Sequence, residues 1–274
     1  MLELAVLVVI GLLVGAYGTV IGAGGGFILV PVLLFLYPEY GPEEVTAISL
    51  LVVFGNSVSG SIAYARQKRI DYRTGMLFAG CSVPGVIAGA LLVPHVPERL
   101  FTGLFGVMLI ALALTSVRAK PAAIRNPLRG PGVLVRTVMD PEGRMYIYAY
   151  RIWQASLLAL GIGFISSLFG IGGGVIQVPA MIMLLHIPVQ FAVATSLFTL
   201  MFMTGGASAV HGVTGSLQGE QLVQAIALMI GAVPGAQIGA VLAWRIKGRH
   251  RLLLLGGAIG LLGVRLLVKA ILYV

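Results

Sequence analysis

Long apolar stretches separated by short polar connections run through the whole chain. Five precede and five follow a polar stretch at 118–151; they are 4–22, 25–37, 44–65, 74–93, 100–117, 153–169, 174–186, 190–211, 221–243 and 252–273. Most contain about 20 residues, the length that an α-helix needs to cross about 30 Å of hydrocarbon. The pattern predicts an all-α polytopic membrane protein with ten membrane segments.

Two of the ten segments are too short for a complete crossing. Segments 25–37 and 174–186 hold 13 residues each, contain Pro31 and Pro179, and begin at a glycine triplet. We expect each to be a half-helix that opens at the triplet. The chain either crosses the membrane here or turns back inside it, and counting charges does not separate these alternatives.

The chain contains an internal repeat. Residues 22–34 read GAGGGFILVPVLL and residues 170–182 read GIGGGVIQVPAMI. The same order continues with AISL at 47–50 against ATSL at 194–197, and with VPG-GA at 83–90 against 233–240. The repeat predicts a first transmembrane half at 1–117, a loop at 118–151 and a second transmembrane half at 152–274.

Composition narrows the class of protein. Apolar residues make up 58% of the chain and charged residues only 10%, whereas soluble domains carry about 25% charged residues. A soluble enzyme and a nucleic-acid binder are therefore excluded, although the net charge is +9. Cys81 is the single cysteine, so an internal disulfide and a multi-cysteine metal site are excluded, and no cofactor or metal is expected.

Lys and Arg predict the orientation, because cytoplasmic loops are enriched in them. The connection 66–73, the loop 118–151 and the turn 245–251 hold 15 of the 18 Lys and Arg residues, and the 38–44 loop is acidic. The basic loops are then expected on the cytoplasmic side of the cell membrane, and both termini on the outer side. Two five-segment halves must insert in opposite directions, so we predict an inverted-topology repeat, the usual plan of a secondary transporter.

Two smaller features have structural interpretations. Within the loop, 132–139 and 144–150 alternate in residue type around Asp140–Gly143, which predicts a β-hairpin. Glycines spaced four apart indicate close helix packing; they are Gly11/Gly15, Gly85/Gly89, Gly231/Gly235/Gly239 and Gly256/Gly260.

The glycine triplets are the first candidates for binding. A half-helix N-terminus offers free N–H groups and about half a positive charge, and glycine allows a ligand to reach the backbone. Two such ends facing each other form a site for a small anion. The triplets are Gly24, Gly25, Gly26 and Gly172, Gly173, Gly174; alternatively, they only permit tight turns.

Polar residues inside apolar spans are the second candidates, because they are costly in a membrane and are often functional. We expect breaks at Gly55–Asn56 and at Thr204–Gly206 to bring polar groups to the midplane. The candidates are Ser49, Asn56, Ser57, Ser166, Gln177, Ser196 and Thr204; for the hydroxyls, a bond to their own helix is the alternative. No carboxylate lies within a span, which disfavours a carboxylate proton relay. His211 near a span end is the one candidate proton switch, although an interfacial histidine without that role is the favoured interpretation.

These motifs resemble the TauE/SafE sulfite exporter family. The resemblance rests on G-x-G-G-G-…-V-P at 22–31 and 170–179, each followed by Ala-x-Ser-Leu and Val-Pro-Gly-x-x-x-Gly-Ala. It implies a transporter of sulfite, thiosulfate, sulfoacetate or a related organosulfonate. Asp71 has no acidic counterpart in the segment 216–219, so we interpret it as an interfacial loop residue.

The sequence therefore predicts a carrier in a lipid bilayer for a small sulfur-containing anion, with export implied by the resemblance alone. An anion channel using the same site is the alternative, an intramembrane enzyme is disfavoured, and a homodimer is left open. Gly25→Val or Gly173→Val should abolish anion flux without loss of expression.

Overall fold

Residues 2–118, 130–140, 143–246 and 248–272 are described by a computed structural model. They form ten α-helices, one short 3-10 helix and one β-hairpin. The elements are α1 (Leu2–Ile21), α2 (Gly26–Leu36), α3 (Pro42–Arg66), α4 (Tyr72–Leu92), η1 (Val93–His95), α5 (Glu98–Arg118), β1 (Val133–Met139), β2 (Met145–Arg151), α6 (Ile152–Phe169), α7 (Gly174–Met183), α8 (Val189–Thr214), α9 (Gly219–Arg245) and α10 (Gly248–Leu272).

The helices are those of a polytopic membrane protein, as predicted. Among the described residues, seven helices are long and apolar enough to cross a membrane, and shorter apolar helices include Gly26–Leu36 and Gly174–Met183. Helix starts follow local chemistry: α3 has Pro42 at its first position, and the Gly41 N–H donates to Glu44 Oε2 at 2.5 Å. Proline and acidic residues both favour the first turn of a helix.

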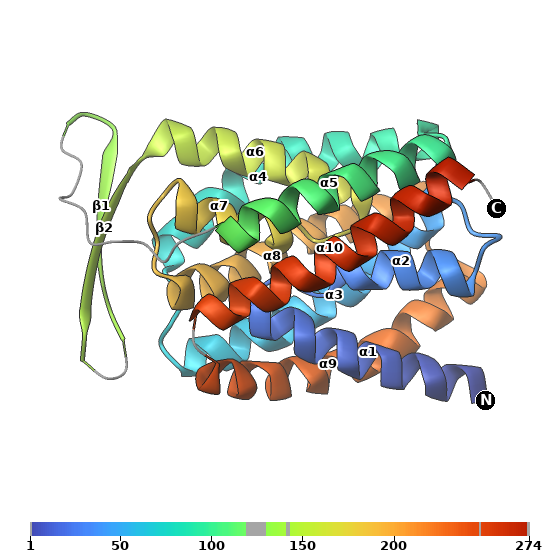
Figure 1. Ribbon diagram of the computed structural model, residues 1–274, viewed down its shortest axis with the longest axis horizontal. Helices are drawn as coiled ribbons and strands as arrows, with labels where there is room; N and C mark the ends of the chain where they lie inside the picture. The colour runs from blue at the N-terminus through green and yellow to red at the C-terminus, as the bar shows by residue number, and fades with distance from the viewer. Residues whose placement is uncertain (1, 119–129, 141–142, 247, 273–274) are drawn as a thin grey trace.

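The two short helices are the returning arms of two helical hairpins. Figure 1 shows α1 starting at the end of the molecule where α10 finishes, and α2 running back to that end. In the second half, α6 and α7 form the same hairpin from the opposite end, beside the β-strands. Both alternatives left open by the sequence reverse the chain in this way, and the short lengths of α2 and α7, 11 and 10 residues, favour a turn inside the membrane.

The two halves exchange partners in a reciprocal way. Helix α1 packs along α9, and α4 packs along α6; α3 lies beside α8, and α5 beside α10. Gly11 and Gly231 bring the backbones of α1 and α9 together at Leu228 and Val8, and Gly85 and Gly89 do the same for α4 against α6. Close packing at these spaced glycines is confirmed, and the reciprocity is that of an inverted repeat. The domain boundaries around 117 and 151 stay predictions.

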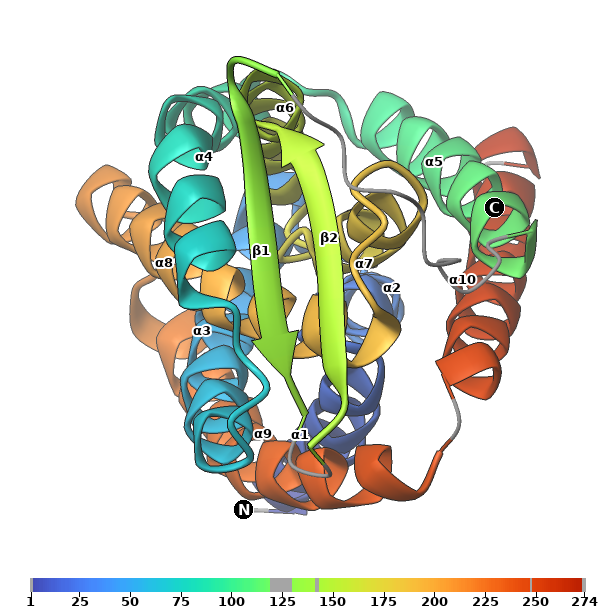
Figure 2. The ribbon, with the colours of Figure 1, turned by 90° about the vertical axis from the view of Figure 1, so that its left-hand side faces the viewer.

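The predicted β-hairpin is present. Strands β1 and β2 pair antiparallel from Val133 opposite Arg151 to Met139 opposite Met145. Pro141 and Glu142 of the predicted turn, and residues 119–129 of the loop, lie outside the described residues. Figure 2 looks onto one end of the helix bundle and shows the hairpin lying across its centre.

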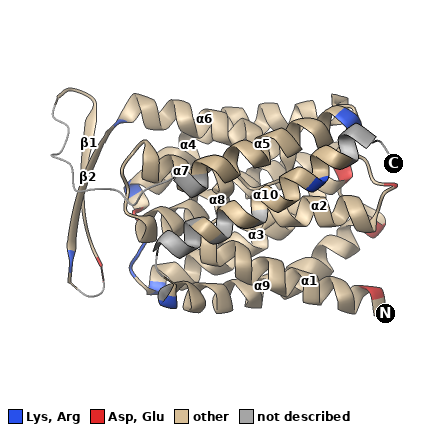
Figure 3. Ribbon diagram, viewed as in Figure 1, with Lys and Arg blue, Asp and Glu red and all other residues tan. Residues whose placement is uncertain are grey.

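Charge is divided between the two ends of the molecule. Figure 3 shows Lys and Arg concentrated at the end that carries the hairpin and the α3–α4 connection, whereas acidic residues gather at the end where α1 begins. We call these the basic end and the acidic end. The division matches the predicted loops; the orientation relative to the cell stays a prediction.

The predicted helix breaks at Gly55–Asn56 and Thr204–Gly206 are wrong. Helices α3 and α8 continue through both positions. The glycines make room for neighbouring side chains instead: a methyl group on Gly55 would meet the Met229 side chain, and one on Gly205 would lie 3.0 Å from the Phe54 ring.

Candidate functional site

The two glycine triplets form tight turns of the same shape. Gly24 and Gly25 have φ angles of 73° and 93°, and Gly172 and Gly173 have φ angles of 78° and 82°. This left-handed backbone is open to glycine without steric cost. Each turn therefore ends with a glycine N-cap, Gly25 for α2 and Gly173 for α7.

The two turns pack against each other inside the molecule. A methyl group on Gly26 would lie 2.7 Å from the carbonyl oxygen of Gly170, and one on Gly174 would meet the carbonyl oxygen of Gly22. Residues 22–26 and 170–174 are buried throughout. The triplets predicted separately from each half thus belong to one centre.

Both short helices begin without a side-chain cap. In α2 the first N–H groups with an acceptor are Ile28 and Leu29, which donate to Gly25 O at 3.0 and 3.1 Å. In α7 they are Ile176 and Gln177, which donate to Gly173 O at 3.0 and 2.9 Å. Neither N-cap receives a side-chain cap. Within the part of the chain that the structure describes, the first N–H groups of both helices are thus without a partner where the two turns pack together, an arrangement that favours an anion.

Helices α3 and α8 cover the turns with matching residues. A methyl group on Gly24 would lie 3.5 Å from Ser57 Oγ, and one on Gly172 would lie 3.5 Å from Thr204 Cγ2. Ser57 and Thr204 occupy the same position of the two repeats, 147 residues apart. The centre is therefore approximately two-fold symmetric.

Two of the predicted polar residues brace the turns. Ser49 Oγ donates to Gly170 O at 2.6 Å, across the boundary between the halves. Asn56 Nδ2 donates to Gly24 O at 3.2 Å and to Thr19 Oγ1 at 3.1 Å. These side chains hold turn carbonyls and α1 in place, so the amide of Asn56 already has protein partners.

Two further predicted hydroxyls, those of Thr204 and Ser166, lie against protein groups. Thr204 Oγ1 donates to Leu200 O of its own helix at 2.7 Å, which is the local alternative considered from the sequence. Ser166 packs against the second turn, since a methyl group on Gly173 would lie 3.2 Å from Ser166 Oγ.

Three predicted polar residues are buried without a partner. Ser57 Oγ, Ser196 Oγ and both amide atoms of Gln177 have no hydrogen bond among the described residues, and all three side chains are 0% exposed. Gln177 belongs to the first turn and a half of α7, and Ser57 faces Gly24. Burying a polar group without a hydrogen bond is unfavourable. These three are therefore the candidates for contact with a ligand.

Apolar residues at the centre were not predicted from the sequence. Val53 Cγ1 would lie 2.7 Å from a methyl group on Gly24 and 2.6 Å from one on Gly172. Leu200 Cδ2 would lie 2.8 and 3.2 Å from the same two positions. Their shared offset of 147 residues was a usable signal, but apolar residues in apolar helices do not stand out.

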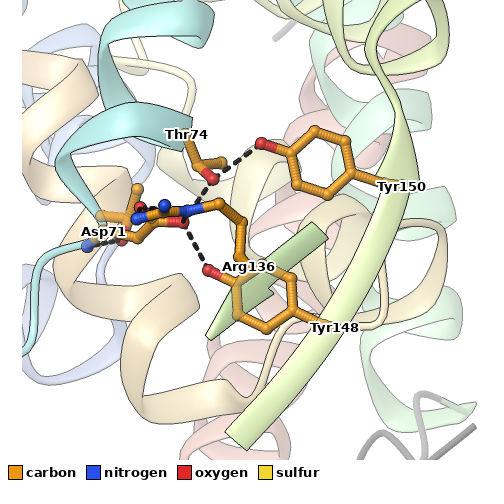
Figure 4. Close-up of polar contacts among 6 residues, drawn as sticks. Asp71, Thr74, Arg136, Tyr148 and Tyr150 are labelled. Carbon is orange, nitrogen blue, oxygen red and sulfur yellow. Dashed lines mark hydrogen bonds and ion pairs between the residues drawn. The ribbon is translucent and has the colours of Figure 1, made fainter. Parts of the chain in front are cut away.

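Asp71 lies in the connection between α3 and α4, as interpreted from the sequence, but its burial and its partners were not predicted. It is 2% exposed, and its carboxylate accepts hydrogen bonds from Arg136 Nε at 3.0 Å and from Nη2 at 2.5 Å (Figure 4). Thr74 Oγ1 and Tyr148 Oη donate to Oδ2, and Thr74 contacts Tyr150 Oη at 2.7 Å. The β-hairpin is thus attached to the start of α4 through the Asp71 carboxylate and the Thr74 hydroxyl.

The charge of this cluster is fixed. Burial raises the pKa of Asp71, but hydrogen bonds from Arg136, Thr74 and Tyr148 outweigh it, and the net pKa lies below 3.8. Burial raises the pKa of Tyr150 to about 12, and burial followed by the Asp71 charge raises the pKa of Tyr148. The carboxylate is therefore ionised and both phenols are neutral at physiological pH.

Two cavities lie away from the glycine turns. One of about 410 Å³ at the acidic end is lined by Glu43, Glu44 and Ser216, among others. One of about 630 Å³ between α3 and α9 is lined mainly by apolar residues, with Arg66 and Gln237. Neither of these two is lined by a residue of either turn, and residues 22–26 and 170–174 are buried in this conformation.

His211 is a buried residue of α8. It is 1% exposed, and neither ring nitrogen has a hydrogen-bond partner among the described residues. The sequence placed it near a span end, where α8 does finish, at Thr214.

Comparisons with known proteins agree on one family. A family model described as "Sulfite exporter TauE/SafE" matches residues 7–266. The probable membrane transporter protein YunE of Bacillus subtilis is 32% identical over 98% of this chain and 99% of its own length. A probable membrane transporter protein of Methanocaldococcus jannaschii is 26% identical over 98% of this chain and 97% of its own length. No solved structure gives a significant match.

Proposed function

Because the chain belongs to the TauE/SafE sulfite exporter family, we propose that it is a secondary transporter of a small sulfur-containing anion such as sulfite, thiosulfate or an organosulfonate. Its site is the centre where the two glycine turns meet. The basic end faces the cytoplasm and the transporter exports its substrate; the direction rests on the family's description alone.

The observation that carries the proposal is the meeting of two uncapped helix N-termini. The first N–H groups of α2 and α7 have no hydrogen-bond partner among the described residues, and the two helix starts, one from each half, pack against each other in one buried region. Backbone donors of this kind compensate an anion without a basic side chain. The hydroxyls of Ser57 and Ser196 and the amide of Gln177 supply further donors.

The inverted hairpins suit transport by alternating access. The α1–α2 hairpin enters from the acidic end and the α6–α7 hairpin from the basic end, so rocking of one half against the other exposes the turns to each side in sequence. In this conformation, Val53 and Leu200 occupy the space beside the buried turns. Binding of an anion requires these side chains to move away from the turns.

The test is anion flux in proteoliposomes. We expect saturable uptake of radiolabelled sulfite or thiosulfate that is stimulated by the same anion on the opposite side. The double variant Ser57→Ala/Gln177→Leu should lower the initial rate about 100-fold, because two donors to the anion are lost at about 1.4 kcal/mol each. Ser82→Ala is the matched control, since Ser82 is equally buried but donates to Ala79 O of its own helix.

Two outcomes would contradict the proposal. Ohmic single-channel currents without exchange stimulation would identify an anion channel that uses the same centre. Wild-type rates in the Ser57→Ala/Gln177→Leu variant would remove the glycine turns as the site.

A further inference from the structure

Val53 and Leu200 lie at the exact point where the two halves would hold an anion, and each of them touches both glycine turns. We infer that this pair sets the size of the transported anion, so that the wild-type protein selects compact oxyanions over sulfonates that carry an organic substituent. The inference rests on the proposed function and deepens it.

The pair is unusual in its position. Val53 belongs to α3 and Leu200 to α8, yet both are 0% exposed and both reach Gly24 and Gly172. Glycine leaves these turns without side chains of their own, so no other side chain closes the space directly beside Gly24 and Gly172 at so short a distance. A ligand that contacts the turn backbones must therefore replace the Val53 and Leu200 methyl groups.

The apolar character of the pair also has a consequence. Neither side chain donates a hydrogen bond, so neither compensates the charge of the anion; the N–H groups and the hydroxyls do that. What branched side chains control is volume and the exclusion of water. One methylene in an apolar pocket changes selectivity by roughly 10-fold or more, so shortening both residues should admit an organic group without abolishing anion binding.

The experiment compares two substrates in one preparation. Initial rates for sulfoacetate and sulfite are measured in proteoliposomes with wild type, Val53→Ala, Leu200→Ala and the double variant. The sulfoacetate/sulfite ratio should rise about 10-fold in each single variant and further in the double variant. Val52→Ala and Leu197→Ala are matched controls on the same helices, since both residues are buried and neither supplies one of the three atoms nearest to a methyl group on Gly24 or Gly172.

The outcomes separate this inference from the proposed function. If wild type transports neither anion, the proposed function fails. If wild type transports sulfite but the ratio stays constant in all variants, only the size-selection role fails. Should the alanine variants lose their folded state, Val53→Ile, which adds one methylene, tests the same claim in the other direction, and an unchanged ratio there would overturn it.

An independent observation concerns the basic end. We also propose that the β1–β2 hairpin is a lid over the basic-end entrance to the glycine turns, latched by the Asp71–Arg136 ion pair. The hairpin lies across the centre of that end (Figure 2). Its inner tyrosines, Tyr148 and Tyr150, are 4% and 1% exposed and pack in the same buried cluster as residues of α6, α7 and α8.

The Asp71–Arg136 ion pair is linked to the proposed site through a hydrogen bond to α8. Asp71 N–H donates to Thr195 Oγ1 at 3.0 Å, and Thr195 directly precedes the unpartnered Ser196. At the acidic end the equivalent position is Gln218, and the cavity of about 410 Å³ lies near it, lined by Gly215 and Ser216. The hairpin covers the basic end and has no counterpart described at the acidic end, so the two ends differ. Exposure of the site to the basic end then requires the Arg136–Asp71 ion pair to break.

The test uses one reporter cysteine. In a Cys81→Ser background, Ser196→Cys is labelled with a polar maleimide in nanodiscs, where both ends are accessible. Arg136→Gln should raise the labelling rate about 10-fold, with Arg136→Lys intermediate because the charge remains but the paired N–H geometry is lost. Arg144→Gln is the control: Arg144 is on the same hairpin with a side chain 68% exposed.

Hydrogen exchange of residues 133–151 supplies the second readout. Faster exchange in Arg136→Gln together with faster labelling supports the lid. Faster exchange with unchanged labelling would show that the released hairpin does not cover the site, and unchanged exchange would show that the ion pair is not its latch. Either of these results overturns the proposal.

Discussion

The unpartnered polar residues near the glycine turns lower the stability of the folded protein, whereas ordinary apolar core residues raise it. Gln177 carries an amide with two unpartnered atoms at 0% exposure. An unsatisfied buried group costs about 1–3 kcal/mol, so its presence is explained by a ligand better than by stability.

Replacing Gln177 by leucine should therefore stabilise the protein and impair transport. We expect the unfolding free energy to rise by about 1 kcal/mol, because the desolvated amide is removed, while anion flux falls. Thermal unfolding in detergent and flux in proteoliposomes give the two values. Lower stability together with normal flux would mean that Gln177 has a packing role.

The structure changes what is expected of a substitution at the turn glycines. Gly25 has a φ of 93°, and a methyl group there would lie 2.7 Å from Val14 Cγ1. Gly25→Val should consequently lower expression and folding as well as flux, against the expectation of intact expression. The amount of monodisperse protein in size-exclusion chromatography measures this, and normal yield would contradict it.

At the scale of elements, side chains of α3 hold the glycine turns. Asn56 connects α3 to Gly24 O and to Thr19 of α1, whereas the equivalent residue of α8 is Met203. Asn56→Leu should reduce the unfolding free energy by about 2 kcal/mol, because a buried carbonyl and a buried hydroxyl lose their partner. Met203→Leu, the control at the matching position, nearly conserves volume and should cost less than about 1.5 kcal/mol.

The hairpin attachment predicts a pH dependence with a definite sign. The folded-state pKa of Asp71 lies below its usual 3.8, so its stabilising contribution is fully present above pH 3.8 and is lost as the pH falls through the folded-state value. Hydrogen exchange of the hairpin, corrected for the intrinsic rate, should be constant between about pH 5 and pH 8. A release near neutral pH would contradict the ion pair.

Elements were more predictable than the contacts between them. Apolar segment lengths, the repeat and the alternating residues of the hairpin are local patterns, and they matched. The expected breaks in α3 and α8 failed because Gly55 and Gly205 are explained by the distant side chains of Met229 and Phe54. Arg136 and Asp71 are 65 residues apart, and no periodicity in either segment indicates that they meet.

At the scale of the whole molecule, the two ends differ in charge, and this difference predicts the orientation in the membrane. The basic end should face the cytoplasm because positively charged loops are retained there. One exposed residue at each end can report this orientation. Val213, near the end of α8, lies at the acidic end and is 90% exposed, and Arg144 of the hairpin lies at the basic end with a side chain 68% exposed.

A cysteine at each position tests this orientation in intact cells, in a Cys81→Ser background. Val213→Cys should react with a membrane-impermeant maleimide from outside, whereas Arg144→Cys should react only after the cells are permeabilised. The reverse pattern would place the hairpin and its Asp71 attachment outside, so the lid would then cover the external entrance. Labelling of both positions in intact cells would mean a mixed orientation, which charge segregation as strong as that in Figure 3 argues against.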